Sequence, residues 1–330
     1  MDKVTTEEGT HKLDDGFEVY TKKWKPSEAP VARLVFIHGF SDHCNAQSQS
    51  QDSHSVHHYI GNNYRDLFPT LASRGIEVWS FDQRGWGRSV HNRSQRGLTG
   101  DTTQVLADLT SFIRAAVPSP PSIPLFLMGH SMGGAEILTW LARAPGPLRS
   151  RVRGVLAESP LVGLHPSTRP SGLLVAAGRL AGRVLPRWQM VRRLDPRLVS
   201  RDEQVGRDYV ADPLCHDTGT LEGLAGMLDR GLEMQAGEVV VPAEAGEGGR
   251  ARLWVSHGTG DGVCDFEASR KWLEEQPVED KSFKAYEGWY HVLHAEPGND
   301  KVMFANDVAD WVLARTPPLD EGGKPVKSKI

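Results

Sequence analysis

The sequence LFLMGHSMGG, residues 125–134, decides the fold. Its four leading apolar residues predict a buried strand, and helical periodicity follows directly at residues 135–144. Between the two, Ser131 stands in the pattern Gly-x-Ser-x-Gly, whose glycines allow the tight turn that lifts the serine hydroxyl away from the backbone. The first N–H groups of the helix point at any negative charge that develops beside the serine. We therefore predict a nucleophilic serine between a strand and a helix.

An alternation of strands and helices extends outward from this turn over most of the chain. Apolar runs predict strands at residues 17–24, 34–37, 76–81, 125–128, 152–157, 253–255 and 283–286. Helical periodicity follows most of them, at residues 64–73, 103–117, 135–144, 266–275 and 302–314. This order implies right-handed crossovers, so we expect an α/β fold with a mainly parallel sheet covered by helices on both faces.

The alternation is interrupted between residues 160 and 240, where Gly, Pro and Arg are frequent. Residues 172–185 are apolar on most of their circumference, so we expect a helical cap at 160–240 that is inserted into the sheet domain. The core is then expected to comprise residues 1–159 and 241–316, followed by a flexible tail at 317–330. Within the first part of the core, the polar run QSQSQDSHSVHHYIGNN at 47–63 predicts a loop insert.

Composition and charge exclude several classes of protein. The 38 basic and 42 acidic residues give a net charge of −4 without a long basic block, so we expect no nucleic-acid partner. Cys44, Cys215 and Cys264 are an odd number without metal-ligand spacing, which favours a reducing compartment and no metal. The start MDKVTTEEGT lacks the apolar core of a signal peptide, and no run of about 18 apolar residues follows. A cytoplasmic protein that does not span a membrane is therefore expected.

A serine hydroxyl needs a base to take its proton and a carboxylate to orient that base. Asp261 follows the predicted strand at 253–255, and His291 follows the next predicted strand. Because catalytic loops gather at the carboxyl ends of parallel strands, we expect both side chains to meet Ser131. Asp265 and His294 are the nearest alternatives. We interpret Asp265 as a carboxylate that starts a helix, and we expect His294 in the helix or turn after His291.

Stabilising a developing oxyanion requires two N–H donors. We expect one from Met132, directly after the serine, and one from Phe40, in the loop after the strand at 34–37. Gly39 allows the backbone to turn sharply enough to aim the second donor, whereas His38 is expected to make a structural hydrogen bond. The run DQRGWGRS at 82–89 is not a dinucleotide-binding pattern, and we expect a tight, ionically braced loop with a supporting role.

Six motifs in a fixed order resemble those of the monoacylglycerol lipases: HGFSDH, DQRGWGRS, GHSMGG, SPLVG, HGTGDGVCD and YEGWYHVLH. These lipases form part of the serine aminopeptidase-like or lysophospholipase-like branch of the α/β-hydrolases. The resemblance covers about residues 10–316 without the insert. It implies the α/β-hydrolase fold and hydrolysis of a monoacylglycerol ester to fatty acid and glycerol without a cofactor. It also implies a triad of Ser131, Asp261 and His291, with Phe40 and Met132 as oxyanion donors.

The resemblance extends to substrate contacts. Cys264 matches a cysteine near the acyl pocket of the family. The other candidates for contact with the substrate are His38, Gly39, His130, Leu161, Val162, Leu174 and Val292. The resemblance further implies that the apolar helix of the cap meets a membrane or lipid droplet, although this helix could equally cover its own core. The insert at 47–63 departs from the family pattern and is either a flap beside the oxyanion loop or sequence that does not belong to the protein.

Other activities share this type of scaffold, because fold and function are separable. Lysophospholipase, carboxylesterase and acyltransferase activities remain alternatives to monoacylglycerol hydrolysis. A non-catalytic, ligand-binding homologue is an alternative of a different class, and it is disfavoured because all three triad candidates are present.

Overall fold

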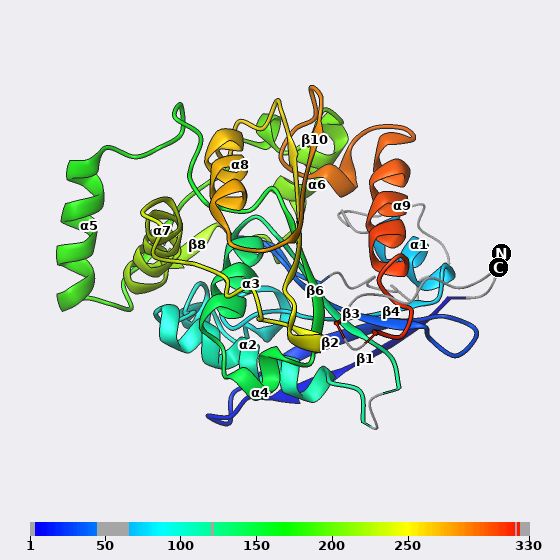
Figure 1. Cartoon of the computed structure of the whole chain (residues 1–330). Helices are drawn as coiled ribbons and strands as arrows, with labels where there is room; N and C mark the ends of the chain where they lie inside the picture. Colours follow the sequence, from blue (N-terminus) through cyan, green and yellow to red (C-terminus); the bar gives the residue numbers. More distant parts are fainter. Residues whose placement is uncertain (1–3, 45–65, 120–121, 321, 324–330) are drawn as a thin grey trace, which may run out of the picture.

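The computed structural model describes residues 4–44, 66–119, 122–320 and 322–323, and eight of the strands within them form one sheet (Figure 1). The strand order is β1-β2-β4-β3-β5-β6-β9-β10. β2 is antiparallel to β1 and to β4, whereas the other pairings are parallel. The strands are β1 (Thr5–Lys12), β2 (Glu18–Lys25), β3 (Ala32–Ile37), β4 (Ile76–Phe81), β5 (Leu125–His130), β6 (Val152–Glu158), β9 (Arg252–Gly258) and β10 (Asp280–Tyr286). The prediction of a mainly parallel sheet is confirmed.

Both faces of this sheet are buried, because the central strands carry apolar side chains on both sides. In β3, Leu34 and Phe36 join one buried cluster, and Val35 and Ile37 join the other. The helices α1 (Leu67–Ser73) and α9 (Asp300–Leu313) cover the first face. The helices α2 (Thr102–Ala116), α3 (Met132–Arg143) and α8 (Phe266–Glu275) cover the second face, and the short α4 (Gly146–Arg149) leads into β6. This layered burial explains the continuous apolar runs of the sequence.

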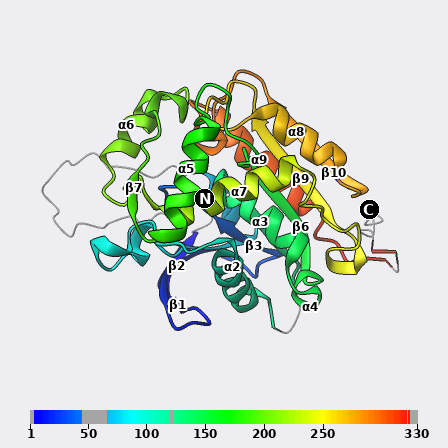
Figure 2. The same cartoon turned by 90° about the vertical axis from the view of Figure 1, so that its left-hand side faces the viewer.

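Between β6 and β9 the chain leaves the sheet, and we call residues 160–240 the cap segment. It contains α5 (Gly172–Val184), β7 (Gln189–Val191), α6 (Glu203–Ala211), β8 (Thr218–Thr220) and α7 (Leu221–Gln235). β7 and β8 form a small antiparallel ladder that the sequence did not predict, because three residues carry no readable periodicity. Figure 1 shows α5 at the outer edge of the molecule, and in Figure 2, where that side faces the viewer, α5 lies in front. It packs against α7.

The cap segment departs from the core and returns to it at nearly the same place. The side-chain amide of Gln235, at the end of α7, donates to the carbonyl of Val162 over 2.8 Å. A side-chain carbon on Gly231 would lie 2.9 Å from the same carbonyl oxygen. The two ends of the cap segment, Val162 shortly after β6 and Gln235 at the end of α7, therefore contact each other.

The remaining sequence predictions concern the segment between β3 and β4 and the presence of a membrane-spanning helix. The helix expected at 64–73 begins at Leu67, and the loop insert expected at 47–63 lies outside the described residues. Short 3₁₀ turns occur at Gly87–Ser89, Arg93–Gln95, Pro196–Leu198, Glu247–Gly249 and Leu293–Ala295. In the described part of the chain, no helix combines the length and the apolar character needed to cross a bilayer.

Candidate active site

Ser131 occupies the tight turn between β5 and α3. Its backbone has φ 54° and ψ −117°, a conformation that residues other than glycine rarely adopt and that costs on the order of 1–3 kcal/mol. Two hydrogen bonds hold it there: the Ser131 N–H donates to the carbonyl of Glu158 over 2.9 Å, and the Leu161 N–H donates to the Ser131 carbonyl over 2.9 Å. The end of β6 and the loop after it thus hold the strained turn that presents the hydroxyl to the site.

The glycines around Ser131 are required by close backbone contacts. A Cβ on Gly129 would lie 2.4 Å from the carbonyl oxygen of Gly133. A Cβ on Gly133 would lie 2.4 Å from the carbonyl oxygen of Ile37, at the end of β3. Helix α3 can therefore begin directly against β3 and β5 only because these positions lack side chains.

Ser131, His291 and Asp261 form one chain of hydrogen bonds. The Ser131 hydroxyl donates to Nε2 of His291 over 2.9 Å, and Nδ1–H of His291 donates to Oδ2 of Asp261 over 2.8 Å. All three residues are buried. Asp261 follows β9 and His291 follows β10, which pair in parallel, so both loops emerge at one edge of the sheet. The structure thus brings together the three side chains that the sequence motifs indicated.

Four hydrogen bonds fix the carboxylate of Asp261. Oδ1 accepts from the N–H groups of Val263 at 2.7 Å and Cys264 at 3.0 Å, and Oδ2 accepts from His257 Nε2 at 2.9 Å as well as from His291. Burial acts to raise the pKa of Asp261, but the electrostatic interactions and hydrogen bonds with His291 and His257 outweigh it and hold this pKa below its usual value. Asp261 therefore stays ionised beside His291.

His257 is a site residue that sequence reasoning missed. It lies at the end of β9 and shares Oδ2 of Asp261 with His291. Its only sequence signal is the spacing of four residues in His257-Gly-Thr-Gly-Asp261.

His294 lies away from the serine, although it follows His291 closely in the sequence. Its Nδ1–H donates to Oε1 of Glu158 over 2.7 Å. The ring of His130 stands between the two histidines, with its centroid 4.8 Å from that of His291 and 5.4 Å from that of His294. Burial and these two neighbours hold the pKa of His130 well below its ordinary value, so His130 is neutral. Asp265, the other alternative, caps α8 by accepting from the N–H of Ala268 over 3.1 Å, as expected.

The loop after β3 lies directly against the nucleophile. A Cβ on Gly39 would be 3.2 Å from Cβ of Ser131, so the adjoining Phe40 is close to the start of α3, where Met132 is the first helical residue. His38 braces this loop: its Nδ1–H donates to the Gly39 carbonyl over 2.8 Å, and its Nε2 accepts from the Gln83 N–H over 2.9 Å. The structural hydrogen bond expected of His38 is present.

The run at 82–89 supports the same loop through one carboxylate. Asp82 accepts from the N–H groups of Cys44 and Arg88, each over 2.7 Å. The ring of Phe40 meets the edge of Trp86 at a centroid distance of 4.9 Å. Together with the bond from Gln83 to His38, these contacts hold the loop that carries Phe40 at its start, at Phe40 itself and at Cys44.

A cavity of about 610 Å³ opens onto this site and is lined by Phe40, Ser131 and His291. Most of its other walls are apolar side chains of the cap segment, including Leu174 of α5 and Leu228 of α7. Of the residues expected to contact substrate, the lining includes His130, Leu161, Leu174 and Val292, whereas His38, Gly39, Val162 and Cys264 lie outside it. Its size is in the range of small-molecule sites. The arrangement can bind an apolar ester and transfer its acyl group to a serine.

A Ser–His–Asp chain on a strand-to-helix turn in a mainly parallel sheet defines a serine hydrolase of the α/β-hydrolase fold. The family described as serine aminopeptidase, S33, matches residues 52–298. A protein of Schizosaccharomyces pombe assigned as a monoglyceride lipase is 34% identical over 307 residues, which is 92% of this chain and 73% of that protein. The chain therefore belongs to the monoglyceride lipase family within the serine aminopeptidase family, as its motifs implied.

Two further relatives extend the comparison. The monoglyceride lipase of Rattus norvegicus is 29% identical over 307 residues, covering 91% of this chain and 88% of the relative. A solved structure of a soluble variant of the Saccharomyces cerevisiae monoglyceride lipase, in complex with a substrate analogue, superposes with a TM-score of 0.81 at 23% identity. That superposition covers 96% of this chain and 97% of the other, which confirms the prediction of an α/β-hydrolase fold.

Proposed function

We propose that the protein hydrolyses monoacylglycerol to a free fatty acid and glycerol through an acyl-enzyme on Ser131. The observation that carries this proposal is the unbroken hydrogen-bond chain from Ser131 through His291 to Asp261, at 2.9 and 2.8 Å, beside an apolar cavity. The monoglyceride lipases among its relatives support the choice of substrate.

In the first half of the reaction, Nε2 of His291 takes the proton of Ser131 as the hydroxyl oxygen attacks the ester carbonyl. The carbonyl oxygen becomes negatively charged, and the N–H groups of Phe40 and Met132 stabilise it, each contributing on the order of 3 kcal/mol. His291 then gives the proton to the departing glycerol oxygen. Asp261 keeps Nδ1 of His291 protonated and stabilises the charged ring.

The second half repeats these steps with water. His291 takes a proton from a water molecule, the resulting hydroxide attacks the acyl carbonyl, and the oxyanion donors act again. The proton returns to Ser131 as the ester bond to the serine breaks. The fatty acid leaves as the free acid. Both halves of the reaction use only groups of the protein, the substrate and water.

Lysophospholipid hydrolysis is the second candidate, and one feature of the cavity favours it. Arg192 and Arg193 of the cap segment line the cavity and are exposed, so they could pair with the phosphate of a lysophospholipid head group. Monoacylglycerol carries no such charge and would not need them.

Two measurements test the function. A fluorophosphonate probe should label wild-type protein and fail to label Ser131→Ala, and equal labelling of both would contradict the assignment of the nucleophile. Hydrolysis of monoacylglycerol, lysophosphatidylcholine and a short nitrophenyl ester should then be compared side by side. We expect the highest kcat/KM for monoacylglycerol, and a preference for the phospholipid that Arg193→Gln abolishes would replace the first candidate with the second.

We also propose that α5 rests on a membrane or lipid-droplet surface while the protein is otherwise cytoplasmic. Of the thirteen residues of α5, all of them described, none is buried, and Leu173, Leu180 and Val184 are strongly exposed. An exposed apolar helix at the outer edge of the cap is suited to a lipid interface, from which substrate enters the cavity. The three free cysteines support a reducing compartment.

A further inference from the structure

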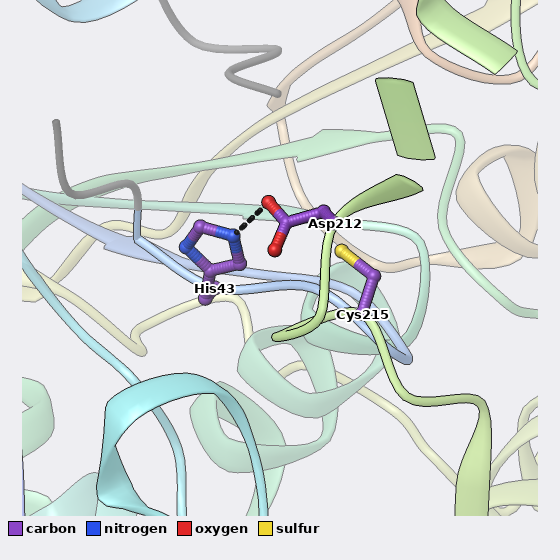
Figure 3. Close-up of side chains that lie close together, drawn as sticks. All are labelled: His43, Asp212 and Cys215. Atoms are coloured by element: carbon purple, nitrogen blue, oxygen red, sulfur yellow. Dashed lines mark hydrogen bonds and ion pairs between the residues drawn. The ribbon is translucent and has the colours of Figure 1, made fainter. Parts of the chain in front are cut away.

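Outside the active site, three side chains of metal-binding type converge where the loop after β3 meets the cap segment (Figure 3). They are His43, three residues beyond Phe40, and Asp212 and Cys215, which follow α6. Nε2 of His43 lies 3.0 Å from Oδ2 of Asp212, and the Cys215 sulfur points toward the same carboxylate. The three potential ligand atoms all lie within 4.8 Å of one another.

The backbone holds these groups in place before any ligand arrives. The N–H of Cys215 donates to the Asp212 carbonyl over 3.1 Å, which closes a turn, and Oδ1 of Asp212 accepts from the Leu214 N–H over 2.8 Å. The N–H of Asp217 donates to the Ser41 hydroxyl over 2.8 Å and fastens this turn to the loop that carries His43. Only small shifts would bring the three atoms to the spacing that a shared ion requires.

The surroundings of the cluster are negatively charged. The side chain of His43 is 6% exposed and that of Asp212 is 11% exposed, so water screens the Asp212 carboxylate poorly. Burial, followed by the carboxylates of Asp42, Asp212, Asp217 and Asp82, raises the pKa of the Cys215 thiol, whereas Arg88 is a positive group close enough to act on Asp212. A cation bound at the sulfur would neutralise part of this excess negative charge.

We propose that His43, Asp212 and Cys215 form a binding site for a divalent transition-metal ion of the Zn²⁺ class. Imidazole nitrogen, thiolate and carboxylate oxygen are the three ligand types that Zn²⁺ takes in proteins, and three protein ligands leave a fourth position for water. The ion binds the thiolate of Cys215 and the neutral ring of His43, whose remaining proton is then on Nδ1. Binding therefore releases the thiol proton, and also the Nε2 proton of any ring that is doubly protonated, so the affinity rises with pH.

An ion in this site would join two parts of the molecule that the hydrogen bond now links. His43 belongs to the loop that presents Phe40 to the active site, whereas Asp212 and Cys215 belong to the cap segment. The metal would therefore fix the cap segment relative to that loop and stabilise the folded protein.

The test has to separate this site from the active site. Asp261, Cys264 and His291 also have potential ligand atoms within 4.8 Å of one another, but they belong to the catalytic chain of hydrogen bonds. Two matched cysteine variants distinguish the clusters. Cys215→Ser removes the sulfur of the proposed metal site, and Cys264→Ser removes the sulfur beside the catalytic residues.

The experiment titrates metal-free, full-length protein with Co²⁺ and follows the charge-transfer absorption of a cobalt–thiolate bond. We expect one equivalent to bind wild-type protein and Cys264→Ser, and no charge-transfer band in Cys215→Ser. Asp212→Asn and His43→Gln should each weaken binding by at least about tenfold, because even indirect partners of metal ligands matter by that factor. Zn²⁺ should compete for the site and raise the melting temperature of wild-type protein.

Melting without metal shows whether each variant is folded. If Cys215→Ser fails to fold, the nearly isosteric Asp212→Asn decides the question by its affinity for Co²⁺. The proposal is wrong if wild-type protein gives no cobalt–thiolate band, if Cys264→Ser abolishes the band, or if Asp212→Asn binds Co²⁺ as tightly as wild-type protein. None of these readouts depends on hydrolytic activity.

Discussion

At the scale of single residues, Asp261 has the most constrained role in the site. Its carboxylate is buried, accepts four hydrogen bonds and holds His291 in the tautomer that can accept the serine proton. An amide at this position would present an N–H group to one of the two histidines and disturb that tautomer.

We therefore predict that Asp261→Asn lowers kcat for monoacylglycerol by about 10⁴-fold. Asp265→Asn is the matched control, because asparagine also caps helices well and should leave kcat within a factor of about two. Steady-state kinetics of the two variants test this, and similar losses in both would show that Asp261 has no special role.

The lowered pKa of Asp261 also predicts a dependence of stability on pH. A carboxylate whose pKa is lower in the folded protein contributes stability that is fully present above its unfolded value of about 3.9 and is lost as the pH falls through its folded value. In urea unfolding from pH 6 to pH 3, wild-type protein should lose more free energy of unfolding than Asp261→Asn. Parallel curves for the two proteins would contradict the lowered pKa.

The sequence indicated Ser131, Asp261 and His291 because each follows a strand that its apolar run makes visible. His257 escaped notice because a histidine at the end of an apolar strand is indistinguishable from a core residue until the loop after it folds back. His43 and Asp212 are 169 positions apart, and no local pattern predicts their contact.

At the scale of elements, the contact between α3 and α7 joins the nucleophile-bearing helix to the cap segment. Glu136 of α3 and Arg230 of α7 form a buried ion pair at 3.1 Å. Burial raises the pKa of Glu136 to about 7, because the favourable charge of Arg230 offsets only part of the lost hydration.

This raised pKa predicts a loss of stability toward alkaline pH. A group whose folded pKa is raised contributes stability that is present below the unfolded value of about 4.5 and is lost as the pH rises through about 7. Between pH 5 and pH 8, wild-type protein should lose about 1–3 kcal/mol of unfolding free energy that Glu136→Gln does not lose. Glu233→Gln, on the same helix as Arg230, removes the half-buried partner of Arg143 and serves as a control, which should follow the wild-type curve in urea unfolding.

The junction of α3 with β3 yields another prediction. Gly133→Ala places a carbon 2.4 Å from the Ile37 carbonyl oxygen, whereas Gly146→Ala meets no atom within 4 Å. We expect Gly133→Ala to cost about 3 kcal/mol or more and to reduce fluorophosphonate labelling, and Gly146→Ala to change stability by less than about 1 kcal/mol. Chemical denaturation of both variants checks this, and equal stabilities would contradict the close packing.

The elements that the sequence revealed are those with buried, repeating side chains. The exposed edge strand β1, with the sequence TTEEGTHK, went unpredicted because almost all its residues face solvent and it has no apolar alternation. Its strand conformation depends on pairing with β2, which is a tertiary effect.

At the scale of the whole molecule, the exposed apolar surface of α5 is the feature that hydrolysis in solution does not explain. Leu173 is 82% exposed, and Leu180 is 65% exposed on the same helix. Val210 of α6 is also 65% exposed and offers a matched position elsewhere in the cap segment.

We predict that Leu180→Ser reduces co-flotation with phosphatidylcholine vesicles several-fold, because it removes apolar area from the lipid interface. Val210→Ser should float like wild-type protein, and both variants should hydrolyse a short soluble ester normally. Equal flotation of Leu180→Ser and wild-type protein would exclude α5 as the contact.

The contact of Val162 with Gln235 and Gly231 has a consequence for how this molecule can change over time. Because the excursion between these residues starts and ends at one point, insertions, deletions or replacement within it leave the strands that carry Ser131, Asp261 and His291 in register. The cavity walls in that excursion determine which substrate binds. This segment can therefore change between related proteins, and substrate choice with it, while the catalytic residues stay the same.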